Sequence, residues 1–233
     1  MATKKKGKQV KKTHTKKRGA RIWIFAAIGV FAVALIVLLV VGNVQNGQTT
    51  FDYTGQPYLG DKHAPVKIVE FGDYKCPYCK NFNETAFPDM QKDLVDTGKA
   101  TFYFMNDPFI YTDSSRAALF AETVYHKLGN KVFWQFHDEL YARQPDGAKY
   151  EQMDVYKPAF LEKTLKTVTN ETNVNKVVKA FNAGTYKKGL KTDQSYVKKL
   201  GIQGTPAFYV NGKAFKGTTY DELIDMVNKA AKK

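Results

Sequence analysis

Two cysteines, Cys76 and Cys79, offer the clearest chemistry in this chain of 233 residues, which contains no other cysteine. Pro77 lies between them, and proline is favoured in the first turn of a helix. Cysteines at positions i and i+3 of a helix bring their Cα atoms to about 5–6 Å, a separation that a disulfide accepts. The free amides and the positive end of a helix lower the pKa of a thiol. The spacing therefore predicts a redox-active pair, with Cys76 as the reactive thiolate and Cys79 as the resolving thiol.

Three other uses of a close cysteine pair have less support in the sequence. A structural zinc site needs four ligands, usually from two paired motifs, and the candidates His63, His126 and His137 form no such pair. Haem attachment needs a histidine directly after the second cysteine, where this chain has Lys80. A purely structural disulfide would close too short a loop to constrain the unfolded chain much. We expect redox chemistry, with no metal ion and no cofactor besides the disulfide of the pair itself.

The pair is expected to lie between two strands that hold it in place. Residues 66–71 are rich in β-branched and aromatic side chains and end in a Gly-Asp turn, as a strand would. The helix that opens at Pro77 should bend or end at Pro88. Residues 100–105 form a second apolar run of strand type. This segment therefore predicts a strand–helix–strand unit with the cysteines at the start of its helix.

The middle of the chain is expected to be helical, and the end to return to strands. A helical block at about 113–200 is too long for a loop in a compact domain, so we expect an inserted subdomain. Asn211-Gly212 is a hairpin signal, and Thr219 or Tyr220 should begin the last helix, which runs toward Ala231. The expected helices of the block are 115–128, 132–143, 158–167, 174–182 and 192–200, and the strands of the hairpin are 207–210 and 214–216.

The N-terminal region carries most of the net charge of +14 and an apolar run. Residues 1–21 hold eight lysines and two arginines; without them, 26 basic residues face 22 acidic ones. Residues 22–41 are uncharged and long enough to cross a bilayer, and the adjacent basic tail would remain in the cytoplasm. A cleaved signal peptide is the alternative, although its apolar part is usually shorter. The basic tail is then a topology determinant, and we expect no nucleic-acid partner. Residues 42–60 are expected to be a linker.

Two motifs resemble the DsbA-type thiol–disulfide oxidoreductases of the thioredoxin superfamily. Residues 69–79 are similar to the active-site segment of that family, and residues 204–213 to its cis-proline loop and hairpin. Residues 133–141 are similar to a helix of the family's inserted helical domain. The resemblance covers residues 58–233. The N-terminal anchor is typical of the Gram-positive, membrane-anchored BdbD-like branch.

The resemblance implies a role for each matching residue. Cys76 matches the nucleophile and Cys79 the buried resolving cysteine. Pro206 matches a proline that is held cis beside the disulfide, and Thr205 would contact the sulfurs and help to bind an extended substrate. Glu70 matches a buried acid that exchanges a proton with Cys79; the alternative is an exposed glutamate at the end of a strand.

The active-site loop residues Pro77 and Tyr78 include one departure from the best-known members. Those proteins carry histidine where this chain has Tyr78, and a histidine cation there would stabilise the Cys76 thiolate directly. Tyrosine cannot provide that charge. The sequence therefore leaves the strength of this chain as an oxidant open.

These observations together predict an α/β protein with a thioredoxin fold and an all-helical insertion over residues 61–233, preceded by one transmembrane helix. The expected function is extracytoplasmic: disulfide exchange at Cys76–Cys79 that introduces disulfides into translocated proteins. Unfolded or folding secreted proteins would be the substrates, and a quinone-linked membrane thiol oxidase would recycle the pair. Residues 22–41 would contact lipid and place the chain in the cell membrane, with its N-terminus in the cytoplasm. The alternatives are a reductase of the same fold, fed by a membrane electron carrier, and a non-enzymatic peptide-binding or chaperone module.

Overall fold

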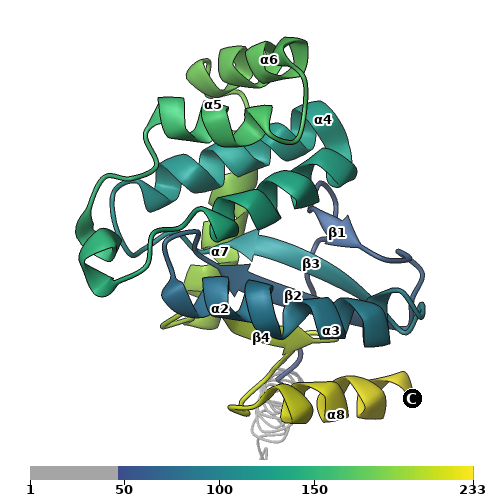
Figure 1. The fold of residues 1–233 in the computed structure, drawn as a ribbon. Helices are drawn as coiled ribbons and strands as arrows, with labels where there is room; N and C mark the ends of the chain where they lie inside the picture. The colour runs from purple at the N-terminus through teal and green to yellow at the C-terminus, as the bar shows by residue number, and fades with distance from the viewer. Residues whose placement is uncertain (1–46, 233) are drawn as a thin grey trace, which may run out of the picture. The chain divides into compact units, whose positions relative to one another are not determined.

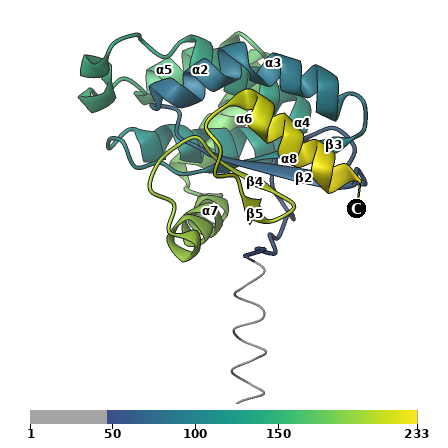
Figure 2. The same ribbon diagram turned by 90° about the horizontal axis from the view of Figure 1, so that it is seen from below.

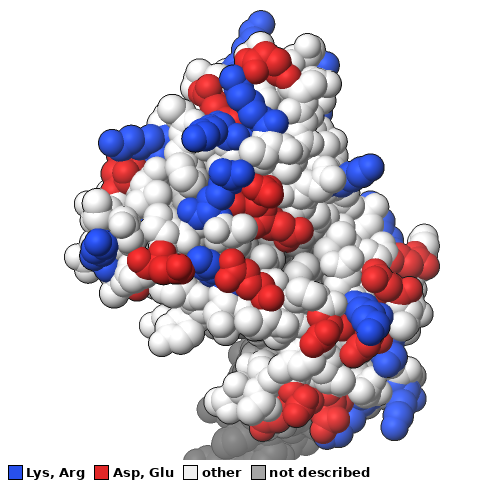
Figure 3. All heavy atoms as spheres, in the orientation of Figure 1, with Lys and Arg blue, Asp and Glu red and all other residues white. Residues whose placement is uncertain are grey.

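The structure is a computed structural model that describes residues 47–232. The expected basic tail at 1–21 and anchor at 22–41 lie outside the described residues. Within residues 47–232, no helix has both the length and the apolar character needed to cross a membrane. Basic and acidic side chains are intermixed on the face of the molecule drawn in Figure 3.

A five-stranded mixed sheet forms the centre of the described chain (Figure 1). Strand β2 (Val66–Gly72) lies in the middle, parallel to β3 (Ala100–Asn106) and antiparallel to β4 (Ala207–Val210). Strands β1 (Tyr58–Leu59) and β5 (Lys213–Ala214) pair with β3 and β4 at the two edges. Nearly every residue of β2 and β3 is buried, as expected for strands covered on both faces.

Helices cover both faces of this sheet. Because successive side chains of a strand point to opposite faces, neighbouring residues of β2 pack against different helices. Ile68 packs with residues of the helices α2 (Pro77–Thr85), α3 (Phe87–Met90) and α8 (Tyr220–Ala231). Val69 and Phe71 point the other way and pack with residues of α7 (Lys187–Leu200). Figure 2 shows α2 and α3 on one side of the sheet and α7 on the other. Five residues of π-helix, Gln91–Val95, follow α3.

The predicted helical insertion is confirmed between β3 and β4. It consists of α4 (Ser114–Ala142), a short 3-10 helix (Ala148–Gln152), α5 (Pro158–Lys166), α6 (Glu171–Asn182) and α7. The two helices expected at 115–128 and 132–143 are continuous in α4 except at Gly129, whose φ of 80° interrupts the helical backbone.

Helix α7 begins at Lys187, five residues before the expected start at 192. The first turn contains Gly189, a poor helix former, so the helix propensity of the sequence did not indicate a start at Lys187. Packing selects glycine there, because a Cβ atom on Gly189 would lie 2.4 Å from the carboxylate of Glu122. Asp193 of the same helix accepts hydrogen bonds from Gln56 and Asn106 and so joins α7 to β3.

The segment expected to be a linker, 42–60, differs from that expectation in its described part. Phe51 is buried against Phe71 and Tyr209. The amide of Thr49 donates to the carbonyl of Gly212, whose φ of +78° and lack of a Cβ allow this close approach. The few aromatic residues of the segment therefore anchor it to the sheet, although most of its composition is polar.

Candidate active site

The turn after β2 places Cys76 at the start of α2. The strand ends at Gly72, where a Cβ atom would lie 2.6 Å from the ring of Phe104 and 3.2 Å from the hydroxyl of Tyr141. Cys76 is the residue before the first helical turn and has extended backbone angles, and Pro77 follows it as predicted. No side chain caps α2 there, so the free amides of its first turn face the sulfur of Cys76.

Cys76 lies against the loop before β4, as the sequence predicted. Its Sγ is 3.2 Å from the carbonyl oxygen of Thr205, and the peptide bond from Thr205 to Pro206 is cis. The pKa of Cys76 is lowered to about 6, first by a hydrogen bond from Cys79 and then by hydrogen bonds with Thr205 and the amides of Cys79 and Tyr78. The Cys76 thiolate is therefore stabilised without a histidine at position 78.

Cys79 lies one helical turn further in and is completely buried, whereas Cys76 keeps 4% of its surface exposed. Burial raises the pKa of Cys79 well above the ordinary value, and the hydrogen bond to Cys76 and the charge of Glu70 act in the same direction. The two thiols therefore differ sharply in acidity, and only Cys76 keeps any exposed surface, although three positions separate them.

Glu70 lies on β2 beneath the pair, between Phe104 of β3 and Phe208 of β4 in the sheet register. It is 3% exposed, so the alternative of an exposed strand-end glutamate is wrong. Burial raises the pKa of Glu70 to about 8, and the charge of Cys76 contributes to this rise. At neutral pH this side chain is mainly a protonated carboxyl group beside two sulfurs.

A groove of about 620 Å³ runs beside Cys76, between α2 and the residues after the cis-proline. Tyr78, which is 74% exposed, lies on its rim. The lining is largely apolar and includes Phe82, Pro206, Phe208, Phe215 and Leu223. The sequence predicted substrate contacts at Thr205 and Pro206, and both residues line this groove.

The sequence did not predict several buried residues around the turn. Tyr141 of α4 is almost fully buried, and its hydroxyl lies 3.4 Å from the carbonyl of Asp73. The hydroxyl of Tyr74 lies 3.1 Å from Nδ1 of His137, whose pKa burial lowers to about 3. Lys75, next to Cys76 in the chain, is also buried. His137 and Tyr141 are four residues apart, a spacing that places two side chains on the same face of a helix, and this spacing could have predicted that they are buried together.

The fold and the cysteine pair define a thioredoxin-like protein with a disulfide-exchange site. Residues 52–229 match the family model described as thioredoxin. The chain therefore belongs to the thioredoxin family, and within it to the DsbA-type oxidoreductases of the BdbD branch, as the relatives show. It is a protein-disulfide oxidoreductase.

Two curated relatives and one solved structure carry this assignment, and a second solved structure shares the fold. Disulfide bond formation protein D of Bacillus subtilis is 38% identical over 179 residues, which are 76% of this chain and 78% of the relative. Probable disulfide bond formation protein D of Bacillus anthracis is 33% identical over 213 residues, covering 88% and 94% of the two chains. The crystal structure of oxidised BdbD from Bacillus subtilis aligns with a TM-score of 0.73 and 36% identity, covering 80% of this chain and 98% of that one. DsbA of Chlamydia trachomatis, at 24% identity and a TM-score of 0.65 over 78% and 93% of the chains, shares the fold.

Proposed function

We propose that this chain oxidises pairs of thiols in secreted proteins outside the cytoplasm, through its Cys76–Cys79 disulfide. The observation that supports this direction is the difference between the two thiols. A thiolate that is stable at neutral pH favours the reduced form of the pair, and a stabilised reduced form makes the disulfide a stronger oxidant.

The proposed reaction has two exchange steps. A substrate thiolate attacks the sulfur of Cys76, the Cys76–Cys79 bond breaks, and Cys79 leaves and takes a proton. The carboxyl group of Glu70 is placed to give that proton, because it is protonated at neutral pH and acts on the buried Cys79. A second substrate thiolate then attacks the substrate sulfur of the mixed disulfide, and Cys76 leaves as a thiolate. Two electrons pass from the substrate to the pair.

The groove beside Cys76 is the proposed substrate site. Its apolar lining suits segments of chains that have not yet buried their hydrophobic residues. The backbone around Thr205, next to the sulfur, could pair with such a segment in extended form, with little selection for its sequence. The proposed function is the disulfide exchange itself. The alternative is that the groove only binds peptides, as a chaperone would.

The reduction potential of the pair tests the direction of the reaction. In equilibrium with glutathione, we expect a potential well above the roughly −270 mV characteristic of thioredoxin and closer to the roughly −120 mV characteristic of DsbA. A potential near that of thioredoxin would instead indicate a reductase fed by a membrane electron carrier. Cys79→Ser, which cannot form the internal disulfide, is the control for a mixed disulfide between Cys76 and glutathione.

The proposed location follows from the first 41 residues of the sequence. Ten basic residues next to an uncharged run of twenty suit a single-pass anchor with its N-terminus in the cytoplasm. After a substrate has reduced Cys76 and Cys79, an oxidant must restore their disulfide. We propose a quinone-linked membrane thiol oxidase as this partner.

Protease treatment of intact cells tests this topology. We expect external protease to remove the globular domain and to leave residues 1–41 protected. A cytoplasmic protein that stays intact is the control. In permeabilised cells, the protease should degrade both this cytoplasmic protein and the globular domain. Release of the whole domain into the medium, with a new N-terminus near Asn43, would establish cleavage of a signal peptide instead.

A further inference from the structure

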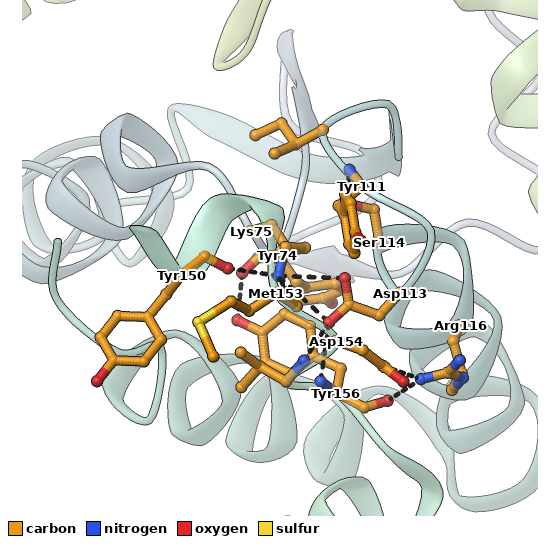
Figure 4. Close-up of polar contacts among 12 residues, drawn as sticks. Tyr74, Lys75, Tyr111, Asp113, Ser114, Arg116, Tyr150, Met153, Asp154 and Tyr156 are labelled. Atoms are coloured by element: carbon orange, nitrogen blue, oxygen red, sulfur yellow. Dashed lines mark hydrogen bonds and ion pairs between the residues drawn. The ribbon is translucent and has the colours of Figure 1, made fainter. Parts of the chain in front are cut away.

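The side-chain ammonium group of Lys75, the residue before Cys76, is buried among polar partners (Figure 4). Its side chain is 2% exposed, and its Nζ lies 3.1 Å from Oδ1 of Asp113, which is 0% exposed. The same ammonium group donates to the carbonyl oxygens of Tyr150 at 2.8 Å and of Met153 at 2.7 Å. One lysine therefore connects the turn before α2 to two separate parts of the helical insertion.

Asp113 extends this connection on the other side. Its Oδ2 accepts hydrogen bonds from the amides of Val155 at 2.7 Å and Tyr156 at 2.9 Å. Asp113 itself is the residue before α4. The carboxylate thus holds the start of α4 and the segment 150–156 around the lysine, and none of these partners belongs to α2.

The turn is also fixed along its backbone by the insertion. Nε2 of Gln144 donates to the carbonyl of Lys75 at 2.7 Å, and the hydroxyl of Tyr156 donates to the carbonyl of Tyr74 at 2.5 Å. The amide of Lys75 donates to the carboxylate of Asp73 at 2.9 Å. Every residue between Gly72 and Cys76 therefore has a specific polar partner, and the last of these residues leads directly into the reactive cysteine.

Stability alone does not explain a buried ion pair in this position. Removing two charges from water is costly, and apolar residues of similar volume often serve equally well or better. A charged pair does impose a defined geometry, because each hydrogen bond restricts the direction of its partner. The position of the pair, one residue from Cys76, indicates what that geometry controls.

We propose that Lys75 is a positioning residue, which together with Asp113 holds the turn at residues 73–76 so that the sulfur of Cys76 faces both the first amides of α2 and Thr205. The helical insertion thereby sets the reactivity of a cysteine that belongs to the thioredoxin part of the fold. This inference rests on the proposed role of Cys76 as the reactive sulfur.

The test measures the ionisation of Cys76 in the reduced full-length protein. We would follow iodoacetamide labelling of Cys76 against pH by mass spectrometry, since only the thiolate reacts. Cys79 and Glu70, the other titratable groups facing Cys76, remain unchanged in all variants. Lys75→Met leaves Asp113 buried without its cation, which opposes folding, so Lys75→Met/Asp113→Leu, which removes both charges, is made in parallel.

In either folded variant we expect the pKa of Cys76 to rise by about one unit toward the free-cysteine value of about 8.5. The labelling rate at pH 5, below both pKa values, should fall about tenfold. Asp113→Asn keeps an acceptor for Val155 and Tyr156 and two carbonyl partners for Lys75, so it should give a smaller shift in the same direction.

Arg116→Met is the matched control. Arg116 pairs with Asp154 at 2.5 Å and donates to the carbonyl of Tyr156, so it ties α4 to the same segment without touching residues 73–76. We expect it to lower the melting temperature and to leave the titration of Cys76 unchanged.

An unchanged Cys76 titration in the double variant would overturn the proposal, whatever happens to its melting temperature. An equal shift in Arg116→Met would also overturn it, because loosening of the segment in general would then be the cause. Neither outcome depends on oxidation of a substrate, so failure of this inference and failure of the proposed function can be told apart.

Discussion

Replacing Cys76 with serine is expected to reduce disulfide exchange to the uncatalysed background, whereas replacing Cys79 with serine should trap substrates on the protein. The reason is the difference in access between the two sulfurs, since Cys79 is 0% exposed. A substrate can reach only Cys76. A serine hydroxyl at that position can neither form a disulfide nor act as the leaving group of an exchange. Without Cys79, Cys76 can still form mixed disulfides by attacking disulfides already present in substrates, and no neighbouring thiol remains to reverse that attack.

Non-reducing gels of cells that carry each variant would measure this difference. Cys79→Ser should give high-molecular-weight bands that disappear on reduction, and Cys76→Ser should give none. The Cys76→Ser/Cys79→Ser double variant is the control for disulfides formed elsewhere. Equal trapping by the two single variants would contradict the assigned order of attack. Full activity of Cys76→Ser in folding assays would favour a binding module without exchange chemistry.

Replacing Glu70 with glutamine is expected to stabilise the reduced protein at neutral pH and to make it a slower catalyst. Burial raises the pKa of Glu70 from 4.5 to about 8. The folded state then holds a proton that the unfolded state has lost, so the free energy of unfolding falls as pH rises from about 4.5 to 8. Glutamine carries no charge and avoids this loss. The advantage of the variant should be near zero at pH 4 and about 3 kcal/mol at pH 7.

Urea unfolding of the reduced proteins between pH 4 and pH 8 would measure this difference in free energy. Glu84→Gln, at a side chain 44% exposed on α2, is the control and should show no comparable dependence on pH. A constant difference between Glu70→Gln and the parent protein across this range would show that Glu70 ionises normally in the folded state.

The same substitution should slow the step in which Cys79 leaves, because the neutral amide cannot give up a proton. General acid–base groups contribute about 10²–10⁴-fold to such steps, so a loss of about 100-fold in the rate of the first exchange is expected. Stopped-flow measurement with a thiol peptide separates this step from the second. A gain in stability with no loss of rate would leave Glu70 without a catalytic role.

Much of the framework could be predicted because it depends on local patterns. The apolar run at 66–71 had strand composition, and Pro77 marked the first turn of the helix that follows. The placement of Thr205 and Pro206 beside Cys76 came from resemblance to a family, since no local rule brings together residues so far apart in the chain. In the structure the Thr205 carbonyl lies 3.2 Å from the sulfur of Cys76, and the bond from Thr205 to Pro206 is cis.

The contacts that surround the site could not be predicted, because each depends on long-range packing. Lys75 has the sequence context of an ordinary surface lysine, and only the fold shows that it meets Asp113 in the interior. Phe51 is a single aromatic residue in a polar segment, and its burial depends on Phe71 and Tyr209. Side chains of this kind have no periodic partner in the sequence, so pattern analysis has nothing to detect.

The helical insertion also separates the two sides of the active site by more than half of the chain. Cys76 and the Thr205 carbonyl that it contacts are 129 positions apart, and β4, which pairs with the strand of Glu70, comes after the insertion. Synthesis runs from the N-terminus, so a growing chain presents both thiols long before the groove beside them can form. Any product that stops before residue 205 keeps its cysteines and β3, but it has neither the substrate wall nor β4, the second of the two strands beside Glu70. The reactive sulfurs therefore come early in biosynthesis, and the surface that would control their use comes late.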